Sequence, residues 1–146
     1  MHVLIIEDNA FNAFCLRRLL ESVLKGITVG IVNNSEAALA QVKTNQPDLI
    51  IVDGDLCASE ELHCNGPELA DKIMSSNPTL PIIVWTNSKA MLKAFSAVFQ
   101  QHQKPFDAFN NWSKMVSSEQ INNSWTQYFG DLAAWDQQNY PAKLQA

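Results

Sequence analysis

The sequence has few basic residues and no hydrophobic run long enough to cross a membrane. Its 10 lysines and arginines are outnumbered by 15 aspartates and glutamates, which gives a formal net charge of −5. Nucleic acids and anionic membrane surfaces attract a basic face, so the overall charge argues against both as partners. No apolar stretch approaches the roughly 20 residues that span a bilayer. We therefore expect neither a nucleic acid nor a membrane to be a partner.

Cysteine is also scarce, and its positions do not suggest a disulfide framework. The three cysteines, Cys15, Cys57 and Cys64, are an odd number at irregular spacing. The N-terminus has no basic segment ahead of an apolar stretch, so we expect no signal peptide and a cytoplasmic location. Cys57, His63 and Cys64 share one stretch of chain, but their spacing is a poor match for a zinc site, and a solvated loop is favoured.

Short apolar runs alternate with segments of helical periodicity along the 146 residues, which is a suitable length for one domain with a sizeable core. The runs predict buried strands at residues 3–6, 27–32, 49–52 and 81–85, and a weak fifth strand within residues 106–112. Helices are expected to begin near Asn9, Ser35, Gly66 and Ser88, and at Ser117 or Ser118. This alternation predicts a doubly wound α/β fold, with a five-stranded parallel sheet and helices on both faces.

Acidic side chains follow two of the predicted strands. Glu7 and Asp8 come directly after residues 3–6, and Asp53 follows residues 49–52. Because ligands of open α/β sheets bind beyond the carboxyl ends of the strands, we expect the three carboxylates to meet in one crevice. Like charges at close range repel, and a hard cation such as Mg²⁺ would neutralise them. The sequence therefore predicts a metal-assisted acidic site.

Three segments together resemble a response-regulator receiver domain, the phosphoacceptor module of two-component signalling, of the chemotaxis-regulator kind. They are VLIIEDNAFNAF at residues 3–14, PDLIIVDGDL at residues 47–56 and LPIIVWTNS at residues 80–88. The resemblance covers roughly residues 1–128 and leaves residues 129–146 as a C-terminal extension, a helical continuation followed by a tail. It implies the flavodoxin-like strand order 2-1-3-4-5.

The resemblance also implies a role for each site residue. Asp53 is the expected phosphoacceptor. The expected Mg²⁺ site consists of Asp8 as a direct ligand, Glu7 through a water, Asp53 itself and the backbone carbonyl of Asp55. Thr86 is expected to hydrogen-bond a phosphoryl oxygen. Phosphoryl transfer depends mainly on positioning and on neutralising oxygen charge, which these groups can supply.

The family also places a lysine after the fifth strand, and two lysines compete for this role. Lys104 belongs to a Lys-Pro-Phe tripeptide like that of the family, but residues 100–103 before it are polar and cannot form a buried strand. Lys114 follows a better strand and precedes the start of a helix. We therefore predict Lys114, with Lys104 as the second choice. This choice requires a longer fourth helix or a longer loop after it.

The sequence departs from the family pattern at several positions. The stretch at residues 55–65 is longer than usual and lacks the usual Met-Pro. Asn111 stands where the family often has an aromatic switch residue, and Asn87 stands where a small residue is preferred. Phosphoacceptance is therefore predicted more strongly than the conventional switching mechanism. Asp55 adds a fourth acid that could position a hydrolytic water.

The favoured function is a receiver in a two-component phosphorelay, with a histidine kinase or a phosphotransfer protein as donor and a downstream protein as partner. It would be a phosphoacceptor rather than an enzyme. One alternative is a degenerate receiver that acts as a phosphorylation-independent interaction module. A less favoured alternative is an Asp-x-Asp phosphatase, because the sequence Asp53-Gly54-Asp55 resembles that motif, but two strands and two helices precede it.

Large apolar residues continue beyond the expected end of the domain. Trp125 and Tyr128 lie at helical spacing and are expected to pack in the core. Leu132, Trp135 and Tyr140 either fold back on the domain or form a surface for a partner or a second copy, so a homodimer stays open.

Overall fold

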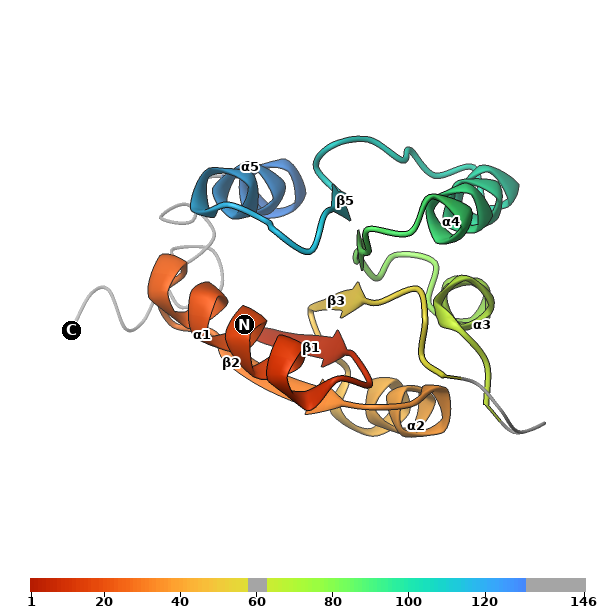
Figure 1. The fold of residues 1–146 in the computed structure, drawn as a ribbon, viewed down its shortest axis with the longest axis horizontal. Helices are drawn as coiled ribbons and strands as arrows, with labels where there is room; N and C mark the ends of the chain where they lie inside the picture. Colours follow the sequence, from red (N-terminus) through yellow and green to blue (C-terminus); the bar gives the residue numbers. More distant parts are fainter. Residues whose placement is uncertain (58–62, 131–146) are drawn as a thin grey trace.

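The computed structural model describes residues 1–57 and 63–130, and these contain one five-stranded parallel sheet (Figure 1). The strand order is β2-β1-β3-β4-β5, so the predicted doubly wound fold and its order are confirmed. The strands are β1 (His2–Ile6), β2 (Thr28–Val32), β3 (Leu49–Val52), β4 (Ile82–Trp85) and β5 (Asn111–Trp112). The described part of the chain contains no helix with the length and hydrophobicity that a membrane span requires.

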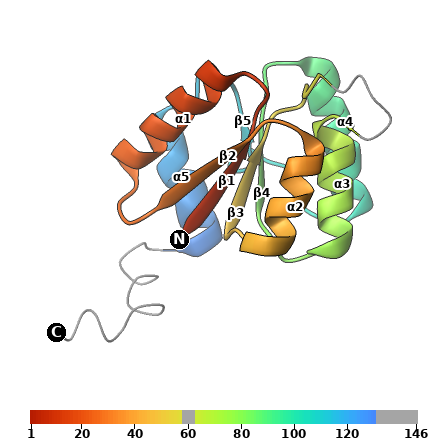
Figure 2. The ribbon, with the colours of Figure 1, turned by 90° about the horizontal axis from the view of Figure 1, so that it is seen from below.

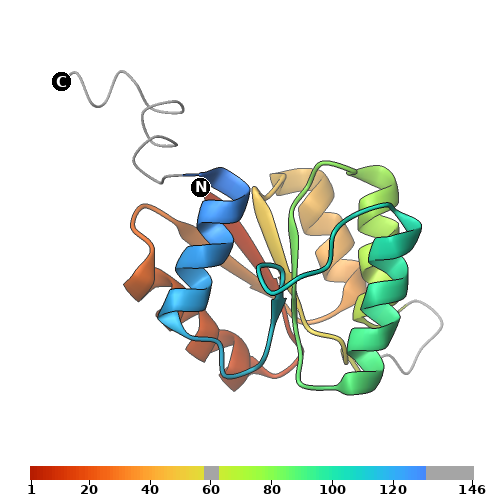
Figure 3. The same cartoon turned by 90° about the horizontal axis from the view of Figure 1, so that it is seen from above.

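Within the described residues, five helices alternate with the strands and cover both faces of the sheet. They are α1 (Ala10–Val23), α2 (Ser35–Asn45), α3 (Gly66–Ser76), α4 (Lys89–Gln101) and α5 (Ser118–Phe129). Helices α1 and α5 lie on one face, and α2, α3 and α4 lie on the other (Figures 2 and 3). Alternate strand residues supply the two cores: Val3 and Ile5 pack on the α1 side, and Leu4 and Ile6 pack on the α2 side. Burial on both faces explains why the strands are continuous apolar runs.

Side-chain caps fix where the helices near the carboxyl end of the sheet begin. The Asn9 side chain accepts a hydrogen bond from the Asn12 backbone N–H at 2.9 Å, and Ser88 caps α4 through Met91 at 3.2 Å. Ser117 caps α5 in the same way, so the helix itself starts at Ser118. These bonds satisfy backbone donors that an uncapped helix would leave unpaired. They hold the loops after β1, β4 and β5 in place.

The last strand is shorter than the predicted segment. Strand β5 has only two residues, and a loop at residues 102–110 separates it from α4. Trp112 anchors this short strand, because its ring is fully buried and its Nε1–H donates to Ser124 Oγ on α5 at 2.8 Å. The longer connection is therefore a loop, and α4 itself ends at Gln101. The predictions for Leu132, Trp135, Tyr140 and most of the extension at 129–146 lie outside the described residues.

Candidate functional site

The acidic residues are placed by the hydrogen-bond ladder of the sheet, which continues past the ends of the strands. Strands β1 and β3 are neighbours with Ile6 opposite Val52. The backbone N–H of Asp53 donates to Ile6 O at 2.9 Å, and that of Glu7 donates to Val32 O at 3.0 Å. The backbone of both acids is therefore fixed at the carboxyl edge of the sheet, where ligands of such folds bind.

The three predicted acids form one cluster. Each of Glu7, Asp8 and Asp53 offers a carboxylate oxygen, and these oxygens lie within 4.8 Å of one another. Glu7 is only 2% exposed and Asp53 is also buried, whereas Asp8 is partly exposed. Hard oxygen donors without soft ligands suit Mg²⁺, so the residues present fit this ion. Cys57, His63 and Cys64 are not brought together as such a group within residues 1–57 and 63–130.

Lys114 reaches into this acidic cluster from the segment after β5. Its Nζ lies 2.8 Å from Glu7 Oε2 and 3.3 Å from Asp53 Oδ1. Its backbone N–H donates to Asn87 Oδ1 at 2.8 Å, which joins the loop after β5 to the loop after β4. Lys104 instead donates to the carbonyl of Pro78, ahead of β4 at the opposite edge of the sheet. Of the two candidate lysines, the structure brings Lys114 to the acids.

The environment of Asp53 raises the pKa of its carboxyl group to about 7. Burial is the main cause, and a hydrogen bond with Glu7 acts in the same direction, because both favour the protonated form. The ammonium of Lys114 opposes them. Asp53 therefore stays partly protonated near neutral pH, and a cation at the cluster would favour its ionised form.

Thr86 and Asp55 lie at the same edge of the sheet. Thr86 follows β4, the neighbour of β3, and its backbone N–H donates to Trp112 O at 3.0 Å. The Thr86 hydroxyl is buried and accepts a hydrogen bond from the Ser88 N–H at 3.1 Å, so its own proton can point elsewhere. Asp55 is exposed, and its Oδ1 accepts the Cys57 N–H at 2.9 Å. Its carboxylate is therefore held within its own loop.

Two contacts at the site were not predicted from the sequence. The thiol of Cys57 hydrogen-bonds to Asp8, and this bond raises the pKa of the thiol to about 11. The ammonium of Lys114 lies 3.7 Å from the ring centroid of Trp85. Both contacts join residues from different loops and strands, so no local motif signals them. The sequence indicates only that Trp85 directly precedes Thr86, which does not by itself predict the contact with Lys114.

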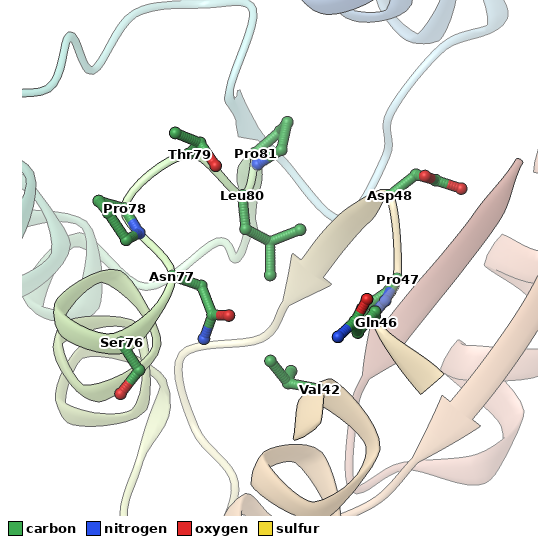
Figure 4. Close-up of a pocket in the computed structure, with 10 residues that line it drawn as sticks. All are labelled: Val42, Gln46, Pro47, Asp48, Ser76, Asn77, Pro78, Thr79, Leu80 and Pro81. Carbon is green, nitrogen blue, oxygen red and sulfur yellow. The ribbon is translucent and has the colours of Figure 1, made fainter. Parts of the chain in front are cut away.

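One cavity in the described part of the molecule is remote from the acids. It has a volume of about 500 Å³ and lies between the ends of α2 and α3 and the starts of β3 and β4 (Figure 4). The Asp48 carboxylate at its rim accepts the His2 backbone N–H at 2.7 Å. None of the predicted site residues lines this cavity.

Comparison with known protein sequences points to one protein family. Residues 3–110 match the family model of the response regulator receiver domain, a segment that contains Glu7, Asp8, Asp53 and Thr86. A protein-glutamate methylesterase/protein-glutamine glutaminase of Halalkalibacterium halodurans is 35% identical over 82 residues, which are 56% of this chain and 22% of that protein. Its counterpart in Idiomarina loihiensis is 33% identical over 85 residues, 58% of this chain and 20% of that protein. The chain thus spans about a fifth of the length of these relatives.

Solved structures of receiver domains have a similar fold. The signal receiver domain of a modulated diguanylate cyclase from Desulfovibrio desulfuricans G20 is 29% identical with a TM-score of 0.69, covering 87% of this chain and 91% of that one. The receiver domain of an HD domain-containing protein from Pseudomonas fluorescens Pf-5 shares the fold at 18% identity, with a TM-score of 0.71 over 97% of this chain and 91% of that one. The acidic triad is typical of the Mg²⁺ site of receivers, which are in general non-catalytic signalling modules that interact with kinases and partner proteins. The chain belongs to the response regulator receiver domain family.

Proposed function

We propose that this receiver accepts a phosphoryl group on Asp53 from a phosphohistidine of a histidine kinase or phosphotransfer protein in the cytoplasm. It would then signal through contacts with a downstream protein. The observation that carries this proposal is the Lys114 ammonium, 3.3 Å from Asp53 Oδ1 beside three clustered carboxylates. A structural ion pair needs only one acid, whereas this arrangement supplies a nucleophile, ligands for a divalent ion and a cation for a phosphoryl oxygen.

The chain's own residues would divide the reaction as follows. A carboxylate oxygen of Asp53 attacks the phosphorus, the new O–P bond forms, and the N–P bond to the donor imidazole breaks. The Lys114 ammonium pairs with one phosphoryl oxygen, and the Thr86 hydroxyl donates to another. Asp8, Asp53 and the backbone carbonyl of Asp55 would hold Mg²⁺, with Glu7 acting through a water. When bound, the ion would neutralise charge on the phosphoryl oxygens.

Phosphorylation of Asp53 can be tested directly with a small phosphodonor. We expect wild type incubated with Mg²⁺ and acetyl phosphate to gain the mass of one phosphoryl group, and Asp53→Asn to gain none, because the amide is not a nucleophile. Intact-protein mass spectrometry measures both. Asp55→Asn is the matched control, since it removes an acid of the same edge but not the acceptor, and it should still gain the group.

An unmodified wild type could also result from rapid hydrolysis. Beryllofluoride, a phosphoryl mimic that is not hydrolysed, separates this case, because it should bind wild type in the presence of Mg²⁺ and raise its melting temperature. If wild type gains no mass and does not respond to beryllofluoride, the degenerate-receiver alternative replaces this proposal.

The two lysines give a second test. We expect Lys114→Met to slow phosphorylation by acetyl phosphate about a hundredfold, because the substitution removes a cation aimed at the transferring phosphoryl group. Lys104→Met should leave the rate unchanged, since that ammonium bonds to Pro78 at the opposite edge of the sheet. The rates follow from a mass-spectrometric time course. Equal rates for the two variants would rule out the assignment of Lys114.

A further inference from the structure

The side chain of Trp85 forms part of the wall of the acidic site. Trp85 is the last residue of β4 and directly precedes Thr86. Its side chain is 3% exposed and packs in the core on the α1 and α5 face of the sheet. From there its ring contacts the Lys114 ammonium, which lies 3.7 Å from the ring centroid. Of all side-chain rings, indole attracts a cation most strongly.

The Lys114 ammonium is held from three sides. Glu7 and Asp53 accept its protons at 2.8 Å and 3.3 Å, and the Trp85 ring lies against it. The Lys114 side chain is only 22% exposed, so water screens these contacts weakly. The two carboxylates attract the ammonium, and the Trp85 ring limits the positions that the ammonium can take beside them.

The backbone around Lys114 does little to fix the direction of its side chain. Strand β5 has only two residues, and Met115, the next residue after Lys114, is 87% exposed and packs little. The Asn87 side chain secures the Lys114 backbone N–H, but not the four-carbon stem. A lysine side chain has many rotamers, so a neighbouring side chain that restricts them matters for the placement of the ammonium.

We propose that Trp85 is a positioning residue, whose indole face holds the Lys114 ammonium at the place where the phosphoryl group of Asp53 will form. This inference rests on the proposed function, since it assigns Trp85 a part in phosphoryl transfer. The ring acts through its face alone, because Trp85 Nε1–H has no hydrogen-bond partner within the described residues. Trp85→Phe therefore keeps an aromatic face without breaking a hydrogen bond, and Trp85→Leu keeps apolar bulk without the face.

The contact itself can be tested without phosphorylation. The full chain is labelled with 5-fluorotryptophan, and the ¹⁹F resonance of residue 85 is assigned by its loss in Trp85→Phe. We expect Lys114→Met to shift this resonance, because a charge against the ring is removed, while the resonance of Trp125 on α5 stays in place. If the residue 85 resonance does not move, the Lys114 contact is absent in solution and the proposal is overturned.

The positioning role is tested by measuring phosphorylation rates of Trp85 variants in the wild-type protein and in Lys114→Met. With acetyl phosphate and Mg²⁺, Trp85→Leu should slow phosphorylation about tenfold and Trp85→Phe should restore most of the rate, since a phenyl face also attracts cations. In Lys114→Met, Trp85→Leu should have no further effect, because the two residues act through one another. The proposal would be overturned if Trp85→Leu slowed phosphorylation equally in wild type and in Lys114→Met. It would also be overturned if Trp85→Leu and wild type were phosphorylated at equal rates. If wild type accepts no phosphoryl group, the proposed function fails by itself, and the fluorine experiment alone decides whether the contact exists.

Discussion

Gly66→Ala is expected to lower the free energy of unfolding by about 3 kcal/mol, because the added methyl group has no space. A Cβ at position 66 would lie 2.2 Å from the backbone oxygen of Asp53, 2.7 Å from Phe95 Cζ and 2.9 Å from Gly54 Cα. Phe95 is fully buried, and the Gly66 N–H also donates to Gly54 O at 2.8 Å. The start of α3 must therefore move away from the segment that carries Asp53.

Urea unfolding of Gly66→Ala measures this loss, and Gly30→Ala is the matched control. A Cβ at Gly30, in β2, would come no closer than 3.3 Å to the edge of the His2 ring. We expect the control to change the free energy of unfolding by less than about 1 kcal/mol. Gly66→Ala should also reduce the rise in melting temperature that we expect from Mg²⁺, because Asp53 shifts with its backbone. Equal effects of the two substitutions would show that the close approach of α3 is not a constraint.

The sequence was sufficient to predict the sheet and the acidic cluster because both depend on short local patterns. Glu7, Asp8 and Asp53 each follow an apolar run directly, and the parallel arrangement brings the ends of those runs together. The choice between two lysines also depended on a local feature, the polar stretch before Lys104. Strand β5 was harder to place within residues 106–112, because only two residues pair with β4 and one tryptophan anchors them.

The side-chain contacts around the site could not be predicted from local patterns. The contacts of Trp85 with Lys114 and of Cys57 with Asp8 join residues 29 and 49 positions apart in the sequence. The close approach of Gly66 to Asp53 likewise depends on how α3 packs against the segment after β3. A hydrophobic period gives the face on which a residue lies, but not which side chain from another element meets it there.

The affinity of the acidic site for Mg²⁺ is expected to rise about tenfold per pH unit from about pH 5 to pH 7, and to level off above that. The reason is the raised pKa of Asp53, about 7, which burial and the Glu7 hydrogen bond cause. Below this pH the carboxyl holds a proton that the ion must displace. Calorimetric titration with Mg²⁺ at several pH values measures the slope, and Asp53→Asn should largely remove it.

The raised pKa of Asp53 also affects the stability of the metal-free protein, which should fall as the pH rises, whereas the affinity for Mg²⁺ rises. A carboxyl whose folded pKa is raised favours folding most fully below its unfolded pKa of about 4, and this contribution is lost as the pH rises through about 7. The melting temperature without Mg²⁺ should therefore fall over this range in wild type, and much less in Asp53→Asn, whose amide cannot ionise. Saturating Mg²⁺ should reverse the fall, because binding to the folded state is then strongest. If both proteins show the same pH dependence, the proton is not on Asp53, and the burial of its charge does not control the site.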